Sequence, residues 1–379
     1  MRNIKIIVGL SFGDEGKGAT VNSLCSIDPT NTLVIRTSGG HQVGHTVRFQ
    51  DIHHAFSNFG SGSLQGVPTY WSEYCTVNPA AVIKEGLALL EKGVVPKVIY
   101  NANAMITTPF DIMHNINVDV AKGQNHGTVG VGFGATIQRN ENHVHLYVRD
   151  LMYPAIRDAK VKQILKYYNF TTPLNDISQR YYEAFIDACD KFIERYTIVD
   201  NFREVDSFNK TLIFEGAQGI MLDMEYGFFP HVTRSYTTSR NAMEFMANNG
   251  LSDSHIETYY VTRAYQTRHG NGPMTNEGMD ISYIKNNPEE TNVDTGYQGY
   301  FRKAPLDLNM LKYAMSCDNF HNAESIKKLV ITCLDQVNED EIPVTENGVL
   351  KRMHYTQIGR YLKNFNIIPV YSDKGYLHY

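Results

Sequence analysis

A glycine-rich loop near the start of the chain holds the residues best suited to chemistry. The segment Gly13-Asp-Glu-Gly-Lys-Gly18 follows an apolar run, residues 4–8, that is typical of a buried strand. Its glycines allow a tight turn that brings N–H groups close to an anion, and a helix starting near Lys17 would direct its positive end to the same place. Asp14 is unusual here, because a carboxylate repels phosphate unless it binds Mg²⁺ or takes a proton. The loop therefore predicts phosphate binding together with catalysis.

A second glycine-rich segment, Gly39-Gly-His-Gln-Val-Gly-His45, adds a histidine and a glutamine to the candidate site. As a generic phosphate-binding loop the first segment is an incomplete match. Ser11 stands at the position of the first glycine, and Gly18 replaces the Ser or Thr that normally holds Mg²⁺. A glycine-rich turn that binds no ligand is the alternative interpretation.

Composition narrows the class of protein. The chain has 379 residues, 42% of them hydrophobic, which is enough for one large α/β domain or two smaller ones. The net charge of −5 gives no general basic surface for nucleic acid or a membrane. The five cysteines are scattered without metal-site spacing and are typical of reduced thiols. Since we find no signal peptide and no apolar run near the ~18 residues that span a membrane, we expect a cytoplasmic protein without nucleic-acid or membrane partners.

The elements that must position these loops alternate between strands and helices. Apolar runs predict strands at residues 4–8, 32–36, 97–100, 211–214, 258–262 and 328–332. Helical patterns lie between them, such as residues 79–93 and 177–196. This alternation predicts an α/β fold with a mostly parallel central sheet and helices on both faces. We expect a single domain over residues 1–379, with a mainly helical insertion or subdomain around residues 153–202.

The motifs resemble those of adenylosuccinate synthetases. Beyond the two glycine-rich segments, further matches follow in the family's order and cover nearly the whole chain: Asn78-Pro-Ala-Ala81, Gly127-Thr-Val-Gly-Val-Gly132, Phe214-Glu-Gly-Ala-Gln-Gly219, Pro230-His-Val-Thr233, Thr237-Thr238, Ala264-Tyr-Gln-Thr-Arg268, Gly272-Pro273 and Thr332-Cys-Leu-Asp335. The resemblance implies a P-loop-like GTP-binding fold and a homodimer. It also implies a purine-biosynthesis ligase that joins L-aspartate to C6 of a 6-oxopurine nucleotide, usually IMP. GTP first phosphorylates the C6 oxygen, and the aspartate amine then displaces phosphate.

The resemblance also implies roles for single residues. Asp14 would take the N1 proton of the purine, His45 would donate to the β–γ bridge of GTP, and Gln218 would contact the base. Mg²⁺ would be held by the Asp14 carboxylate and the Gly44 carbonyl. Asp335 would accept from guanine N1–H and N2–H₂ and so select GTP over ATP. The full expected GTP-binding set is Gly13, Glu15, Gly16, Lys17, Gly18, Gly44, Thr46, Asp335 and Ser372.

The substrate segments depart from the family pattern. Gln42 replaces an Asn, Val129 replaces a phosphate-binding Thr, and Val131 replaces an Arg. The expected purine-nucleotide set is Gln42, Thr128, Val129, His143 and Thr238, where His143 takes the place of an Arg offered across the dimer interface. The expected aspartate set is Thr295, Gly296, Arg302 and Lys303, where the two cations would meet a carboxylate.

Several alternatives remain open from the sequence. The same chemistry could act on dGMP or dIMP, as in a phage branch of the family, or the chain could be a GTP-binding regulator or inactive relative. Structural roles are the alternatives for single residues: a helix cap for Asp14, a turn for Asp335, and satisfied loop or core positions for His45 and Gln218. The retained Asp14, Lys17, His45 and Gln218 favour an enzyme.

Overall fold

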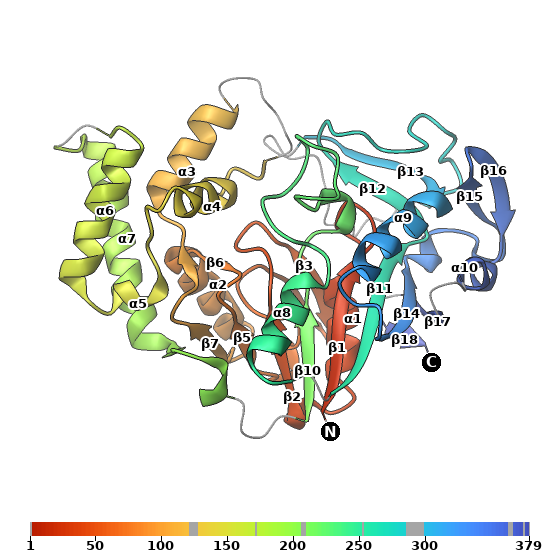
Figure 1. Ribbon diagram of the computed structural model, residues 1–379, viewed down its shortest axis with the longest axis horizontal. Helices are drawn as coiled ribbons and strands as arrows, with labels where there is room; N and C mark the ends of the chain where they lie inside the picture. Colours follow the sequence, from red (N-terminus) through yellow and green to blue (C-terminus); the bar gives the residue numbers. More distant parts are fainter. Residues whose placement is uncertain are drawn as a thin grey trace.

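A large, mostly parallel sheet forms the centre of the molecule (Figure 1). The computed structural model describes residues 2–120, 128–170, 173–205, 210–251, 254–285, 299–362, 367–373 and 376–378. The sheet has ten strands, in the order β18 (Tyr376–His378), β17 (Ile367–Asp373), β14 (Ile326–Thr332), β11 (His255–Arg263), β1 (Asn3–Gly9), β10 (Thr211–Glu215), β2 (Thr32–Arg36), β5 (Thr69–Trp71), β7 (Val98–Asn101) and β9 (Thr197–Val199). Every neighbouring pair is parallel except β17–β18.

The predicted strands are confirmed as β1, β2, β7, β10, β11 and β14. The sequence analysis missed four strands of this sheet. β5, β9 and β18 have three residues each, too few for a pattern to stand out, whereas β17 has seven residues and was missed as well. The mostly parallel α/β class is confirmed.

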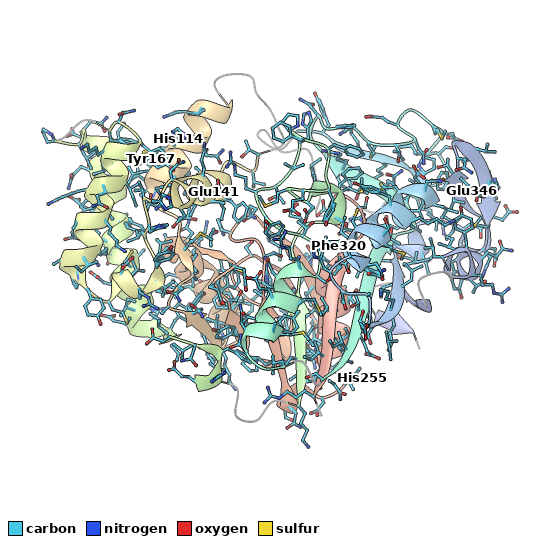
Figure 2. The ribbon with its side chains drawn as sticks, in the orientation of Figure 1. His114, Glu141, Tyr167, His255, Phe320 and Glu346 are labelled. Atoms are coloured by element: carbon cyan, nitrogen blue, oxygen red, sulfur yellow. The ribbon has the colours of Figure 1, made fainter. Side chains whose placement is uncertain are left out.

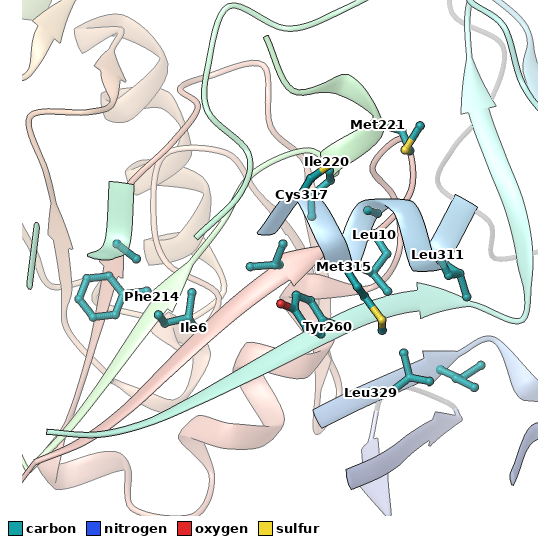
Figure 3. Packing of buried hydrophobic residues seen from close by; sticks show 14 of the residues in the cluster. Ile6, Leu10, Phe214, Ile220, Met221, Tyr260, Leu311, Met315, Cys317 and Leu329 are labelled. Carbon is teal, nitrogen blue, oxygen red and sulfur yellow. The ribbon is translucent and has the colours of Figure 1, made fainter. Parts of the chain in front are cut away.

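Alternation along β1 explains why helices cover both faces of the sheet. Ile4, Ile6 and Val8 point to one face, where they share a core with α8 (Arg240–Asn248) and α9 (Leu308–Asn319). Ile7 points to the other face and packs in a smaller cluster with α1 (Lys17–Cys25). Figure 3 shows α9 lying over the strands, with Leu311 and Met315 directed at the sheet near Tyr260 and Leu329. The period of two therefore places apolar side chains on both faces.

A group of helices flanks one end of the sheet (Figure 1). It comprises α2 (Pro79–Glu91), α3 (Pro109–Asn115), α4 (Phe133–Glu141), α5 (Val148–Leu151), α6 (Pro154–Tyr167) and α7 (Asp176–Arg195). The expected helical stretch around residues 153–202 contains α6 and α7, and after α7 it contains β9, which pairs with β7. Phe185 and Phe192 of α7 pack in a core with Tyr100 of β7. None of the helices in the described part of the chain has the length and apolar character that a membrane crossing requires.

Smaller elements complete the other end and the loops. A second sheet contains β12 (Tyr265–His269), β13 (Phe301–Asp307), β15 (Ile342–Glu346) and β16 (Val349–Met353), and α10 (Tyr355–Tyr361) follows it in the chain. Two short pairs are β3 (His45–Phe49) with β4 (Ile52–Phe56), and β6 (Thr76–Val77) with β8 (Met105–Ile106). Short 3₁₀ turns cover Pro29–Asn31, Ser63–Gln65, Phe202–Glu204, Ile220–Leu222, Leu334–Gln336 and Glu339–Glu341, and a π turn covers Ile116–Val120.

Candidate active site

A cavity of about 1470 Å³ lies at the carboxyl ends of the central strands. Its walls come from the segments that follow β1, β2, β10, β11 and β14, and from α3 and α4. Ligands of open parallel sheets bind at this edge, because the loops that leave neighbouring strands converge there. The expected site residues that line the cavity are Gly13, Asp14, Glu15, Gly16, Lys17, Gly18, Gln42, Gly44, His45, Thr46, Thr128, Val129, Gln218 and Asp335.

The glycine-rich loop is braced from inside by Glu15. Its carboxylate accepts hydrogen bonds from the N–H groups of Ser11 and Gly13, both at 3.0 Å, and its other oxygen is 2.5 Å from Lys17 Nζ. The side chains of Glu15 and Lys17 are 1% and 3% exposed. Gly9 is needed here, because a Cβ at this position would lie 2.5 Å from the Glu15 carboxylate. The charge of Lys17 is therefore balanced within the loop.

The turn into α1 requires a left-handed residue at Gly16, whose φ is 96°. The hydroxyl of Thr332, at the end of β14, donates to the Glu15 carbonyl at 2.6 Å and ties the loop to the sheet. The helix has no side-chain cap, so the structure does not support the alternative that Asp14 caps it.

Asp14 contacts two basic residues that the sequence analysis did not select. Its carbonyl accepts from Arg263 Nε at 2.5 Å, and its Oδ2 is 3.5 Å from His269 Nε2. Burial raises the pKa of the Asp14 carboxyl, while the charges of Arg263 and His269 oppose this rise. The side chain is still 25% exposed, so it can reach a ligand in the cavity. A carboxyl group with a raised pKa is suited to accept a proton near neutral pH.

His45 is held by a buried carboxylate at the end of β10. Its Nδ1 is 2.6 Å from Oε1 of Glu215. The same oxygen accepts from the hydroxyl of Ser61, and Oε2 of Glu215 accepts from the N–H of Ser61 at 3.0 Å. Burial alone would raise the pKa of Glu215, but the charge and hydrogen bond of His45, together with Arg36, lower it to about 2. Since an ionised carboxylate can only accept, Nδ1 carries the proton and Nε2 is the nitrogen able to meet a ligand. Burial lowers the pKa of His45, and Glu215 opposes this effect.

Two glutamines contribute amide groups to the cavity. Both amide atoms of Gln42 are buried and have no hydrogen-bond partner in the described part of the chain, which makes this side chain a strong candidate for a ligand contact. Gln218 follows β10 with a φ of 61°, and its Oε1 lies 3.5 Å from the position of a Cβ on Gly13. The fold thus places Gln218 against the glycine-rich loop.

The expected purine-nucleotide residues occupy different places. Thr128 lines the cavity, but its hydroxyl is engaged by the side chain of Asn115 at 3.1–3.2 Å. Thr238 is buried, its hydroxyl lacks a hydrogen-bond partner among the described residues, and it lies outside the cavity lining. His143 is exposed just after α4 and is also outside the lining.

The expected aspartate-binding cations do not line the described cavity. Arg302 donates to the Gly272 carbonyl at 2.5 Å and to Glu277 at 2.6 Å, and Lys303 lies over the rings of Tyr265 and Phe301. Neither residue is in the described lining. Thr295 and Gly296 fall outside the described residues. Ser372 lies in β17, and Asp335 follows β14 in the turn that lines the cavity.

Arg268 is a cavity residue that the sequence analysis quoted only as part of a motif. It is the cross-strand partner of Arg302 and lines the cavity. Burial and the nearby Arg302 lower the pKa of Arg268 to about 10. Arg263 and His269 were missed as site residues, although Arg263 directly follows the predicted strand at 258–262. A charged residue at the carboxyl end of a predicted parallel strand was the available signal.

Comparison with known proteins agrees with this architecture. The sequence model of the adenylosuccinate synthetase family matches residues 6–372. The adenylosuccinate synthetase of Marinomonas sp. (strain MWYL1) is 31% identical over 286 residues, covering 73% of this chain and 65% of that protein. The matched part of the chain thus spans slightly less than two thirds of that relative's length.

Two solved structures have a similar fold. One is the fully ligated adenylosuccinate synthetase from Plasmodium falciparum, with a TM-score of 0.76, 18% identity and coverage of 99% of this chain and 98% of that chain. The other is the succinoaminodeoxyadenylate synthetase of cyanophage S-2L bound to dGMP and dATP, with a TM-score of 0.63, 14% identity and coverage of 98% and 93%. Because the family's sequence model extends over almost the whole chain, this protein belongs to the adenylosuccinate synthetase family.

Proposed function

We propose that the protein is a GTP-dependent ligase that joins L-aspartate to C6 of a 6-oxopurine nucleotide. With IMP the products are adenylosuccinate, GDP and phosphate. The observation that carries this proposal is the convergence of Asp14, Lys17, His45 and Gln218 on one cavity, next to two glycine-rich loops. An acid–base group, a phosphate-binding loop and a buried imidazole are the parts that such a two-step reaction needs.

In the first step Asp14 takes the N1 proton of the purine, and the O6 oxygen then attacks the γ-phosphate of GTP. The raised pKa of Asp14 supports this role, because a base is most effective when its pKa is near the working pH. Gln218 lies beside the loop that carries Asp14 and orients the base by its amide. The bond between the γ-phosphorus and the bridging oxygen breaks as the bond to O6 forms.

His45 stabilises the charge that develops on GDP as it leaves. Glu215 keeps the Nδ1 proton of His45 in place, so Nε2 is the atom directed to a phosphate oxygen. The residues also suit Mg²⁺, which prefers oxygen ligands and needs few protein groups when a nucleotide supplies the rest. The Asp14 carboxylate and Gly44 carbonyl would hold it, and a Cβ at Gly44 would have no neighbour within 4 Å. When bound, Mg²⁺ would neutralise phosphate charge.

In the second step the amine of L-aspartate displaces the 6-phosphoryl group. Arg268 is the buried guanidinium that would bind a carboxylate of L-aspartate. Its cross-strand neighbour Arg302 adds to the positive potential at this position. Gln42 and Thr128 contribute to the purine-nucleotide side of the cavity, and Asp335 reads guanine in GTP. We expect the enzyme to act as a homodimer in the cytoplasm.

The proposal is tested by product formation. Purified protein is incubated with Mg²⁺, GTP and L-aspartate, and IMP, dIMP, GMP or dGMP is offered in separate reactions. Mass spectrometry then detects the succinyl-amino product. Product from IMP supports the proposed reaction, whereas product from dGMP or dIMP alone supports a deoxynucleotide-modifying enzyme. No product from any nucleotide, with GTP still bound, would overturn the ligase and favour a GTP-binding regulator.

A further inference from the structure

An exposed ion pair forms part of the cavity wall. Arg234 Nη1 is 3.0 Å from Glu141 Oε2, and the two side chains are 45% and 50% exposed. Both residues line the cavity, and Figure 2 shows Glu141 on α4, near His114 of α3. Water screens a pair of this kind, so it contributes little to stability. Arg234 can therefore exchange Glu141 for another anion at small cost.

The stem of Arg234 passes the first turn of α4. A Cβ at Gly134, the second residue of α4, would lie 3.9 Å from Cδ of Arg234. Glu141, which now binds the guanidinium, is the last residue of the same helix. Since Cδ already lies beside this turn, rotation about the terminal torsions of Arg234 can turn its guanidinium away from Glu141 and toward the start of the helix. At its N-terminus, α4 begins after Gly132 and has no side-chain cap. The N–H groups of this turn carry partial positive charge and face no capping side chain.

The side chains beside this turn cannot bind an anion strongly. Val129 and Val131 line the cavity and have no donor. The hydroxyl of Thr128 is engaged with Asn115 and also accepts from the N–H of Gly130 at 3.2 Å. An anion bound here would depend on backbone N–H groups and on a cation from elsewhere in the fold.

Three other cations that line the cavity already hold contacts within the fold. Lys17 is paired with the buried Glu15. Arg263 donates to the Asp14 carbonyl, and Arg268 donates to the Pro273 carbonyl at 2.5 Å. Arg234 differs from these three, because its partner is an exposed carboxylate that lies beside the cavity.

We propose that Arg234 leaves Glu141 and binds the 5′-phosphate of the purine nucleotide beside the first turn of α4. This inference rests on the proposed function, because it names a binding residue of the same substrate. A guanidinium binds phosphate through two parallel charge-assisted hydrogen bonds. A phosphate monoester also carries more negative charge than the single carboxylate of Glu141, so it attracts Arg234 more strongly. Glu141 then acts as a competitor that holds Arg234 when the nucleotide is absent.

The test compares nucleotides with their nucleosides. Binding of IMP, dGMP, inosine and deoxyguanosine is measured by titration calorimetry for the wild type, Arg234→Gln and Glu141→Gln. The matched control is Arg240→Gln, because Arg240 forms a similar exposed pair with Glu225 at 3.0 Å and lies outside the described cavity lining. Titration with GTP in each variant checks that the remainder of the site is intact.

We expect Arg234→Gln to weaken binding of the tighter monophosphate by about 10- to 100-fold and to leave nucleoside binding unchanged. Glu141→Gln should tighten monophosphate binding by up to about 5-fold, since it removes the competing carboxylate. Arg240→Gln should bind like the wild type. Equal monophosphate affinity in Arg234→Gln and the wild type, or an equal loss for nucleosides, would overturn this inference alone. A wild-type protein that binds GTP but no other purine nucleotide would overturn the proposed function as well.

Discussion

Nδ1 of His45 lies 2.6 Å from Oε1 of Glu215, although 170 positions separate the two residues in the chain. Both side chains are buried, at 7% and 0% exposure. Arg36 is the register neighbour of Glu215 on the adjacent strand and is also fully buried. The imidazole is therefore fixed in orientation and tautomer before any ligand arrives, which is the preorganisation that electrostatic catalysis requires.

Replacing Glu215 by Gln should impair catalysis much more than nucleotide binding. Glutamine keeps one acceptor oxygen for two donors, Nδ1–H of His45 and N–H of Ser61, and it carries no negative charge, so His45 changes tautomer or loses its orientation. We expect turnover to fall by roughly 10²- to 10⁴-fold, by analogy with loss of the charged acceptor in a catalytic triad. Steady-state kinetics and GTP titration measure the two effects. Glu257→Gln is the control, since Glu257 pairs with Lys328 at 2.7 Å outside the described cavity lining. Normal turnover in Glu215→Gln would exclude this role.

The same carboxylate should make stability depend on acidity. The pKa of Glu215 is lowered from 4.5 to about 2 in the folded protein. The unfolded chain therefore binds more protons as the pH falls below about 4.5, and stability present above that pH is lost on the way to pH 2. The contribution is about 3 kcal/mol at neutral pH. Urea unfolding at pH 6, 4 and 3 should show the gap between wild type and Glu215→Gln shrinking with acid; a constant gap would contradict this.

Removing Lys17 alone should be costly, because it leaves the buried Glu15 carboxylate without its cation. We expect Lys17→Met to destabilise the protein by about 3–5 kcal/mol. The double variant Glu15→Gln, Lys17→Met should lose less than the sum of the single variants. A double-mutant cycle in urea measures this coupling. The exposed pair Asp187–Lys191 is the control and should couple by less than about 1 kcal/mol. Equal coupling in both pairs would show that burial adds nothing.

Asp14→Asn should abolish turnover and leave GTP affinity within a few-fold of the wild type. Asparagine keeps the size of the side chain, but it cannot take a proton from the purine. Single-turnover phosphate release and GTP titration separate the two properties, and thermal unfolding checks the fold. Wild-type turnover in this variant would show that another group is the base.

Asp335→Asn should weaken GTP selectively. The Asp335 carboxylate would accept two hydrogen bonds from guanine, one from N1–H and one from N2–H₂. In the variant, the amide nitrogen of the asparagine would place its own N–H groups against one of these guanine donors. We expect GTP affinity to fall by about 10- to 100-fold, with ATP affinity unchanged or improved. Competition binding with the two nucleotides measures the ratio. An equal loss for GTP and ATP would assign Asp335 a role in the shape of the turn.

Local pattern was sufficient to predict the class of fold. The apolar runs at residues 4–8 and 211–214 are confirmed as β1 and β10, because buried parallel strands are apolar on both faces. The helix at residues 177–196 is confirmed as α7, because its apolar positions follow a helical period. Short strands such as β9 lack enough residues to show either period.

The motifs also identified much of the cavity lining, including Asp14, Lys17, His45 and Gln218. A phosphate-binding loop is a local structure, so its glycines and its lysine can be recognised in sequence. The ion pair between Glu15 and Lys17 inside the loop could not be predicted from sequence, since it depends on how the turn closes.

Only the tertiary structure decided which distant residues complete the site. Glu215 meets His45 because β10 lies beside β2, and the segment after β2 leads to His45. Arg263 meets Asp14 because β11 lies beside β1, and His269 reaches Asp14 from β12, which follows β11 in the chain. Strand order follows from packing across the whole sheet, and no local pattern encodes it. The exchange proposed for Arg234 likewise depends on a loop folding against α4, a contact between segments that are 93 positions apart.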